Sequence, residues 1–234
     1  MFPLKDNAPR TCFPAITLLL IAVNTLIFLY QVTLNPASLQ VFVMQNAVVP
    51  YRVSLFLDGR APIETALVPF FTSMFLHANW LHLIGNMWFL WIFGDNVEDA
   101  FGAFAYLVFY LTCGISASVV QFLISPLSRI PTIGASGAIA GVMGAYLFLY
   151  PRARVLTLIP FFFFFTIEIP AALMLIYWFV IQFFSGIASL GISHSSGGVA
   201  FWAHVGGFII GMLLTGFFRR PVRPVRPQYY YYDR

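Results

Sequence analysis

A serine, two histidines and an asparagine interrupt stretches of this sequence that are otherwise strongly apolar. They are Ser136, His204, and the pair His82 and Asn86, which lie four residues apart. Polar and ionisable groups are costly inside a bilayer, so each needs a reason to be there. A serine hydroxyl becomes a good nucleophile when a neighbouring imidazole accepts its proton. These residue types therefore predict acyl-transfer chemistry by a Ser–His dyad.

Helix geometry places these polar groups at a common depth. Counted at about 1.5 Å per residue from the far end of each apolar segment, the depth is about 21 Å for Ser136, about 22 Å for His204 and about 20 Å for His82. In a hydrocarbon core about 30 Å thick, all three lie below one surface and away from the midplane. Polar groups at one depth on three segments indicate a site.

Small residues give two of these segments faces that can pack at backbone distance. Gly134 and Gly137 flank the serine, and His204 shares a helical face with Gly207 and Gly211. Such small-xxx-small faces let membrane helices approach closely. Packing the two faces together would bring the serine toward the histidine.

The oxyanion formed in acyl transfer needs hydrogen-bond donors that are already in place. His82 and Asn86, at positions i and i+4, share a helix face and carry side-chain donors. The backbone N–H of Ser136, at a helix N-terminus, can supply another. Glu168 and the acidic group at 95–99 belong to the opposite side of the membrane. We therefore expect a dyad without a third, acidic member.

The composition shows that the elements carrying these residues face lipid. The sequence is 60% hydrophobic and only 9% charged, whereas a soluble domain keeps about a quarter of its residues charged. Apolar segments long enough to be membrane helices occur at about 14–30, 80–95, 104–124, 136–150, 170–185 and 200–218. We expect an all-α membrane protein with six transmembrane helices.

The connections between these segments divide the chain. The stretch 31–79 is long and carries few charges, and Pro160 and Pro170 divide an apolar block too long for one helix. The Phe-rich run at 161–165 would then lie at the membrane interface. A Gly/Ser-rich loop at 186–198 precedes the last segment. We expect a cytosolic N-terminus at 1–13, one membrane domain at 14–218 and a disordered cytosolic tail at 219–234.

Lysine and arginine are distributed unevenly between the two sides of the predicted bundle. Nine lie on the side of both termini and three on the other. The positive-inside rule places the side with more cations, and hence both termini, in the cytosol. The cations form no stripe of the kind that binds nucleic acid, so we expect no nucleic-acid partner.

Three motifs together resemble the signature of the rhomboid intramembrane serine proteases. They are Gly134-Ala135-Ser136-Gly137, then Phe75-Leu76-His77 followed by His82 and Asn86, and finally Ala203-His204 followed by Gly207 and Gly211. They occur in the family's order and in the corresponding segments. The resemblance implies a six-helix rhomboid bundle with a catalytic cavity that opens to the outside.

The resemblance also implies a role for each residue. Ser136 would be the nucleophile and His204 the general base, with His82 and Asn86 lining the oxyanion hole. His77 would be a structural, hydrogen-bonding residue near the site. The structural glycines near the site would be Gly134, Gly137, Gly207 and Gly211. Two positions depart from the family pattern. Ala140 replaces an aromatic residue that stacks on the base in many members, and Tyr51-Arg52 stands where many have a Trp-Arg pair. The imidazole must therefore be held by other groups.

The family's activity implies partners and a location. Its members cleave transmembrane segments of other proteins and use no cofactor and no metal. We therefore expect a serine protease embedded in the lipid bilayer, with transmembrane protein substrates cleaved near the outer side. As a location we expect a bacterial-type plasma (inner) membrane, crossed several times.

Other functions remain as alternatives. A catalytically silent rhomboid-like protein that binds membrane clients is disfavoured because both Ser136 and His204 are present. A transporter is disfavoured because the sequence shows neither a substrate-binding charge at the midplane nor an obvious internal repeat. A metal site on His77, His82 and His204 is disfavoured because the first two lie about 140° apart around a helix. A probe that reacts with activated serines separates a protease from these alternatives.

Overall fold

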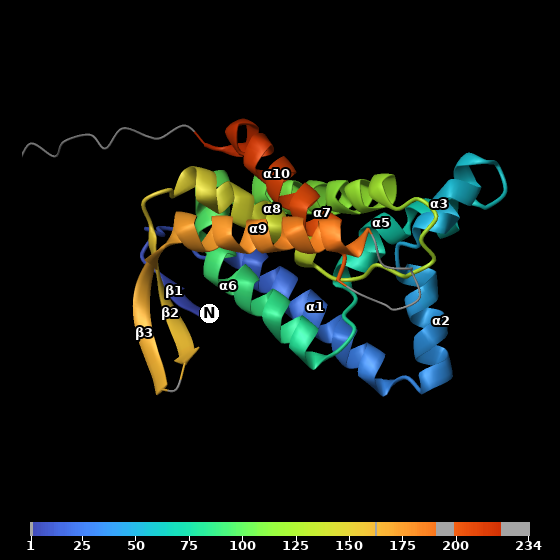
Figure 1. The fold of residues 1–234 in the computed structure, drawn as a ribbon, viewed down its shortest axis with the longest axis horizontal. Coiled ribbons are helices and arrows are strands. Elements are labelled where there is room, and N and C mark those ends of the chain that lie inside the picture. Colours follow the sequence, from blue (N-terminus) through green and yellow to red (C-terminus); the bar gives the residue numbers. More distant parts are fainter. Residues whose placement is uncertain (1, 162, 191–198, 221–234) are drawn as a thin grey trace, which may run out of the picture.

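The computed structural model describes residues 2–161, 163–190 and 199–220 of the chain. Its long helices are α1 (Ala15–Thr33), α6 (Trp80–Phe101), α7 (Ala103–Ile124), α8 (Ser136–Leu149), α9 (Ala171–Ser189) and α10 (Phe201–Phe218). Each of the six predicted apolar segments forms one of these helices (Figure 1). The fold is therefore mostly helical, as the sequence predicts.

The helices differ in their capacity to cross a membrane. Among the described residues, α1, α7, α9 and α10 are long and apolar enough to do so. A fifth candidate span joins Ile63–Phe75 to Trp80–Phe101, and these two parts meet at an angle of 75°. α8 has 14 residues, so it is about 21 Å long, less than the bilayer core of about 30 Å. The described part of the chain thus contains four or five candidate spans.

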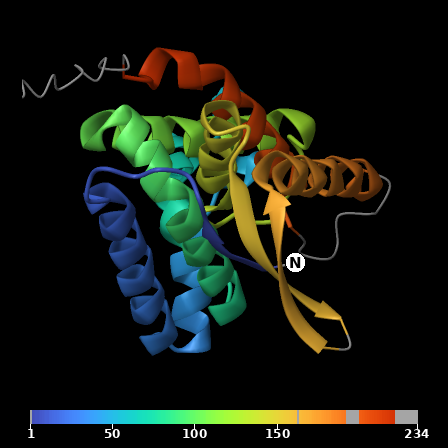
Figure 2. The ribbon, with the colours of Figure 1, turned by 90° about the vertical axis from the view of Figure 1, so that its left-hand side faces the viewer.

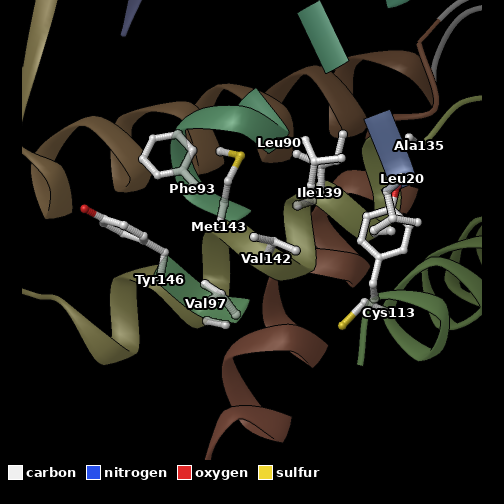
Figure 3. Close-up of a cluster of buried hydrophobic side chains, with 14 of the residues drawn as sticks. Leu20, Leu90, Phe93, Val97, Cys113, Ala135, Ile139, Val142, Met143 and Tyr146 are labelled. Atoms are coloured by element: carbon white, nitrogen blue, oxygen red, sulfur yellow. The ribbon is translucent and has the colours of Figure 1, made fainter. Parts of the chain in front are cut away.

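α8 lies inside the bundle, with the other long helices around it (Figure 2). Every residue from Gly137 to Tyr146 is buried. Figure 3 shows one side of this helix packed against α6, with Ile139, Val142, Met143 and Tyr146 near Leu90, Phe93 and Val97. A helix that is apolar on all faces is typical of such a buried position.

Glycines join α8 to α10 at backbone distance. A Cβ atom added at Gly207 would lie 2.1 Å from the carbonyl oxygen of Gly137. One added at Gly211 would lie 2.2 Å from the carbonyl oxygen of Gly141. Any side chain at these positions would force the two helices apart, so the small-residue faces pack together as the sequence predicts. This glycine seam sets the distance between the first turns of the two helices.

A three-stranded antiparallel sheet corrects the prediction of an all-α fold. β1 (Phe2–Asp6) pairs with β2 (Arg154–Phe161), and β2 pairs with β3 (Phe163–Pro170). Phe161 and residues 163–165 of the Phe-rich run therefore belong to these two paired strands. The run's neighbours Val155, Thr157 and Ile159 are β-branched residues, which favour strands. The sheet also contains Phe2–Asp6 of the predicted N-terminal segment at 1–13, and it lies at one end of the bundle (Figure 1).

Short helices occupy the opposite end of the bundle (Figure 1). Within the predicted connection at 31–79 lie α2 (Pro36–Asn46), α3 (Pro50–Leu57), α4 (Ile63–Leu67), α5 (Pro69–Thr72) and a 3₁₀ turn (Ser73–Phe75). α6 continues to Phe101 rather than ending near position 95, and α9 continues to Ser189, within the predicted Gly/Ser-rich loop. The rest of that loop at 191–198 and the predicted tail at 221–234 lie outside the described residues.

Candidate active site

Ser136 and His204, predicted to act together, are in hydrogen-bonding contact. The Oγ of Ser136 lies 2.7 Å from the Nε2 of His204. On the other side of the ring, Nδ1 of His204 lies 2.8 Å from the carboxamide oxygen of Gln182. Because an amide oxygen only accepts hydrogen bonds, Nδ1 carries the proton and Nε2 is left to accept the serine hydroxyl. This is the tautomer that a general base requires.

Two residues of α9 reach this imidazole, and the sequence reasoning missed both. Besides Gln182, the ring of Trp178 lies 5.7 Å from that of His204 between centroids, at an interplanar angle of 35°. Their spacing of four residues places both on one face of α9. They contact the ring of His204, for which Ala140 offers no aromatic partner. The overlooked signal was Gln182 itself, a carboxamide in an apolar membrane helix, where a polar side chain needs a reason.

Two further N–H donors lie beside the backbone that precedes Ser136. The Nδ1 of His82 accepts a hydrogen bond of 3.4 Å from the backbone N–H of Ala78, so its Nε2 carries the proton. Asn86 is only 8% exposed, and its Nδ2 has no hydrogen-bond partner among the described residues. A Cβ atom added at Gly134 would lie 2.8 Å from Nε2 of His82 and 3.6 Å from Nδ2 of Asn86.

The loop before Ser136 is held by the short helices at its end of the bundle. Gly134 has a φ of 121°, a conformation that favours glycine. Its N–H donates to the carbonyl oxygen of Ser73 over 2.8 Å. Two residues earlier, Thr132 pairs with Val48 in an isolated antiparallel bridge. The segment at 31–79 therefore helps to fix the position of the backbone just before Ser136.

His77 lies behind His82, with ring centroids 5.1 Å apart and the rings 69° from parallel. Its backbone N–H and carbonyl bond to the side chain of Gln31 at 3.1 and 3.2 Å. Neither ring nitrogen has a hydrogen-bond partner among the described residues. The structure thus gives His77 hydrogen bonds through its main chain, while its ring packs against that of His82.

A cavity of about 820 Å³ opens beside these groups. Its lining includes Ser136, His204, His82 and Asn86, and also small residues of α7 such as Gly114. Among the described residues that line it there is no carboxylate, lysine or arginine. The cavity therefore offers room beside the serine, together with neutral donors and a neutral base.

The sequence is similar to known proteins over much of its length. The rhomboid domain family matches residues 64–221. Rhomboid-like protein 11, chloroplastic, of Arabidopsis thaliana is 42% identical over 89 residues, which are 38% of this chain and 30% of the relative. Rhomboid protein 1, mitochondrial, of Saccharomyces cerevisiae is 28% identical over 168 residues, or 69% of this chain and 45% of the relative.

A bacterial relative is also similar. The rhomboid protease GluP of Bacillus subtilis is 42% identical over 77 residues, which are 33% of this chain and 15% of the relative. The chain thus spans less than half the length of each of these three relatives. The apolar helices, together with the rhomboid relatives, support an integral membrane protein. Two of these relatives are named chloroplastic and mitochondrial, so the comparisons do not specify the bacterial inner membrane. Because the domain match covers more than half of the sequence, the chain belongs to the rhomboid family.

Proposed function

We propose that the chain is an intramembrane serine endopeptidase that cleaves transmembrane segments of other membrane proteins. The observation that carries this proposal is the contact of 2.7 Å between Oγ of Ser136 and Nε2 of His204. The serine lies at the start of a buried helix and lines a cavity, so its hydroxyl is next to space for a substrate. The relative GluP is named a rhomboid protease.

The proposed reaction uses the groups around this contact. His204 accepts the hydroxyl proton of Ser136 while Oγ attacks the carbonyl carbon of the scissile bond. The resulting oxyanion accepts hydrogen bonds from Nε2–H of His82, Nδ2–H of Asn86 and the backbone N–H of Ser136. His204 then gives its proton to the leaving amine, and water hydrolyses the acyl-enzyme. These steps need no cofactor and no metal ion.

The position of the dyad supports a substrate within the membrane. α8 is about 21 Å long, so with its end at the cytosolic surface its start lies about 9 Å below the outer edge of a core about 30 Å thick. A client helix must unwind there to present an extended peptide bond, and residues that weaken helices favour this because they release the backbone hydrogen bonds. We infer that cleavage occurs near the outer side.

The same proposal assigns a topology. The six transmembrane helices are α1, α6, α7, α8, α9 and α10, and α8, which is shorter than the core, starts below the outer edge. Both termini and the sheet lie in the cytosol, where nine of the 12 cations would gather. Residues 14–218 form the membrane domain, flanked by 1–13 and a tail at 219–234. A bacterial-type plasma membrane is the proposed location.

Labelling with a fluorophosphonate probe tests the activated serine. In detergent, wild type should be labelled, Ser136→Ala should not, and His204→Ala should react far more slowly because the hydroxyl keeps its proton. Thermal unfolding of each variant shows that it is folded. Cleavage of a transmembrane substrate by wild type and not by Ser136→Ala then establishes the peptidase. A folded wild type that neither reacts nor cleaves would support a silent, client-binding protein instead.

A further inference from the structure

Gln182 is the one carboxamide in α9, and it is buried. Gln182 is only 9% exposed. Its Oε1 lies 2.8 Å from Nδ1 of His204, across the ring from Ser136. The general base is therefore bracketed by the nucleophile on one nitrogen and by a neutral acceptor on the other.

We propose that Gln182 is the positioning residue for the general base. This inference rests on the proposed peptidase function and assigns to α9 a task within it. By accepting the Nδ1–H of His204, Gln182 keeps the Nε2 lone pair on Ser136. Trp178, one turn away on the same face of α9, limits rotation of the ring.

The physical reason lies in the two tautomers of a neutral imidazole. Which nitrogen carries the proton is set by the hydrogen bond that the other one makes. Without Gln182, a proton on Nδ1 would be buried without an acceptor, which is costly in an apolar site. The proton would then move to Nε2, where the ring is a donor and cannot deprotonate Ser136. Gln182 thus selects the productive form.

A neutral acceptor also determines how the charged intermediate is stabilised. When the proton of Ser136 Oγ passes to Nε2, Nδ1 keeps its own proton and Gln182 stays neutral. The positive ring then has the carboxamide dipole at Nδ1 and the indole of Trp178 5.7 Å away between centroids. This distance is within the range of about 6 Å over which an aromatic ring attracts a cation.

The packing of α9 in the bundle controls the contact between Gln182 and His204. The helix carries Gln182 and Trp178 on its inner face, while residues such as Phe184, which is 63% exposed, lie on its outer face. Its partners in the bundle are chiefly α10 and α8, the two helices that hold the dyad. The base is therefore aligned only while α9 is seated against them.

Substitutions at position 182 test this assignment. Gln182→Leu removes the acceptor and leaves an apolar side chain of similar size, so kcat and the rate of fluorophosphonate labelling should fall about 10- to 100-fold with little change in KM. Gln182→Glu places a carboxylate at Nδ1, which favours the protonated ring, so the acidic limb of the pH–rate profile should move to higher pH. Phe184→Leu, on the outer face of the same helix, is the matched control and should behave as wild type.

The outcomes separate this inference from the protease proposal. If wild type is labelled and Gln182→Leu reacts within twofold of it, or Gln182→Glu leaves the acidic limb unmoved, Gln182 does not position the base although the protease stands. Nitrogen-15 NMR of the histidines, with His204→Ala to assign the ring, reads the tautomer without any substrate. Loss of the Nδ1–H form in Gln182→Leu supports the inference even where wild type fails to cleave, and its retention overturns it.

Discussion

Glu98 and Asn86, two buried polar side chains near opposite ends of α6, differ in their hydrogen bonding. At the sheet end, the carboxylate of Glu98 is 3% exposed. It accepts hydrogen bonds of 2.9 Å from Ile16 N–H, 2.8 Å from Thr17 N–H and 2.8 Å from the Thr17 hydroxyl. At the other end, Asn86 is 8% exposed, lines the cavity and has no partner for Nδ2 in the described part of the chain.

The difference separates what the fold needs from what the chemistry needs. Glu98 satisfies N–H groups in the first turn of α1, which lack partners within their own helix, and so it joins the start of α1 to α6. Asn86 has no partner for its Nδ2 among the described residues and lies on the cavity, where an entering acceptor can reach it.

The largest expected effect follows from removing the unpaired donor. Asn86→Ala should lower kcat about 100- to 1000-fold, because one oxyanion donor is lost. Its thermal unfolding temperature should stay the same or rise, because no hydrogen bond of the resting protein is broken. Cleavage of a membrane substrate and thermal unfolding in detergent, measured on the same preparation, check both parts. A variant that is clearly less stable than wild type would make Asn86 a structural residue.

Removing the carboxylate of Glu98 should lower stability and leave activity nearly unchanged, the reverse of the result expected for Asn86. Glu98→Ala should lower the free energy of unfolding by about 2–4 kcal/mol, because several buried donors on α1 lose their acceptor. The labelling rate per folded molecule should remain close to wild type, since Glu98 is far from the cavity along α6. Denaturant titration in mixed micelles gives the stability. Glu98→Gln keeps one carbonyl oxygen as an acceptor, so a loss as large as that of Glu98→Ala would contradict this account.

The glycine seam between α8 and α10 holds the bundle together and also sets the spacing of Ser136 and His204. A change there should therefore affect both the stability and the labelling rate. Gly207→Ala would place a methyl group 2.1 Å from the Gly137 carbonyl oxygen and force the helices apart. We expect a loss of about 1–3 kcal/mol and slower labelling, because Ser136 and His204 separate. Gly216→Ala is the matched control, since a Cβ atom added there meets nothing within 4 Å. Equal behaviour of the two variants would show that the seam does not set the dyad distance.

Sequence reasoning reached the helices and the contact between Ser136 and His204 because both depend on local patterns. Apolar runs located all six long helices, and the spacing of Gly207 and Gly211 behind His204 indicated the face that meets α8. Ser136 then followed from the small residues around it. A helical period fixes which residues share a face, so these predictions needed no knowledge of the tertiary fold.

The parts that were missed depend on residues far apart in the chain. β1 completes the sheet through pairs such as Phe2 with Leu158, which no local pattern reveals. α6 continues to Phe101, and its acidic residues near the end bond to the N-terminal segment, as Asp99 does with Thr11. Gln182 was overlooked although a carboxamide in an apolar helix is a local signal, and its partner His204 lies on another helix.

The smallest change in stability should come from Glu168, a second carboxylate at the sheet end. It tests whether the contribution of a carboxylate to stability depends on its location or on its burial. Glu168 lies 3.2 Å from Nε of Arg154 on the neighbouring strand, but the two side chains are 61% and 52% exposed. Water and salt screen such a pair, so Glu168→Gln should change the free energy of unfolding by no more than about 0.5 kcal/mol. The same denaturant titration at low and high salt measures it. A loss as large as that for Glu98→Gln would mean that the strand pairing itself depends on this charge. A negligible loss would show that burial with full pairing, rather than position at this end of the bundle, makes Glu98 structural.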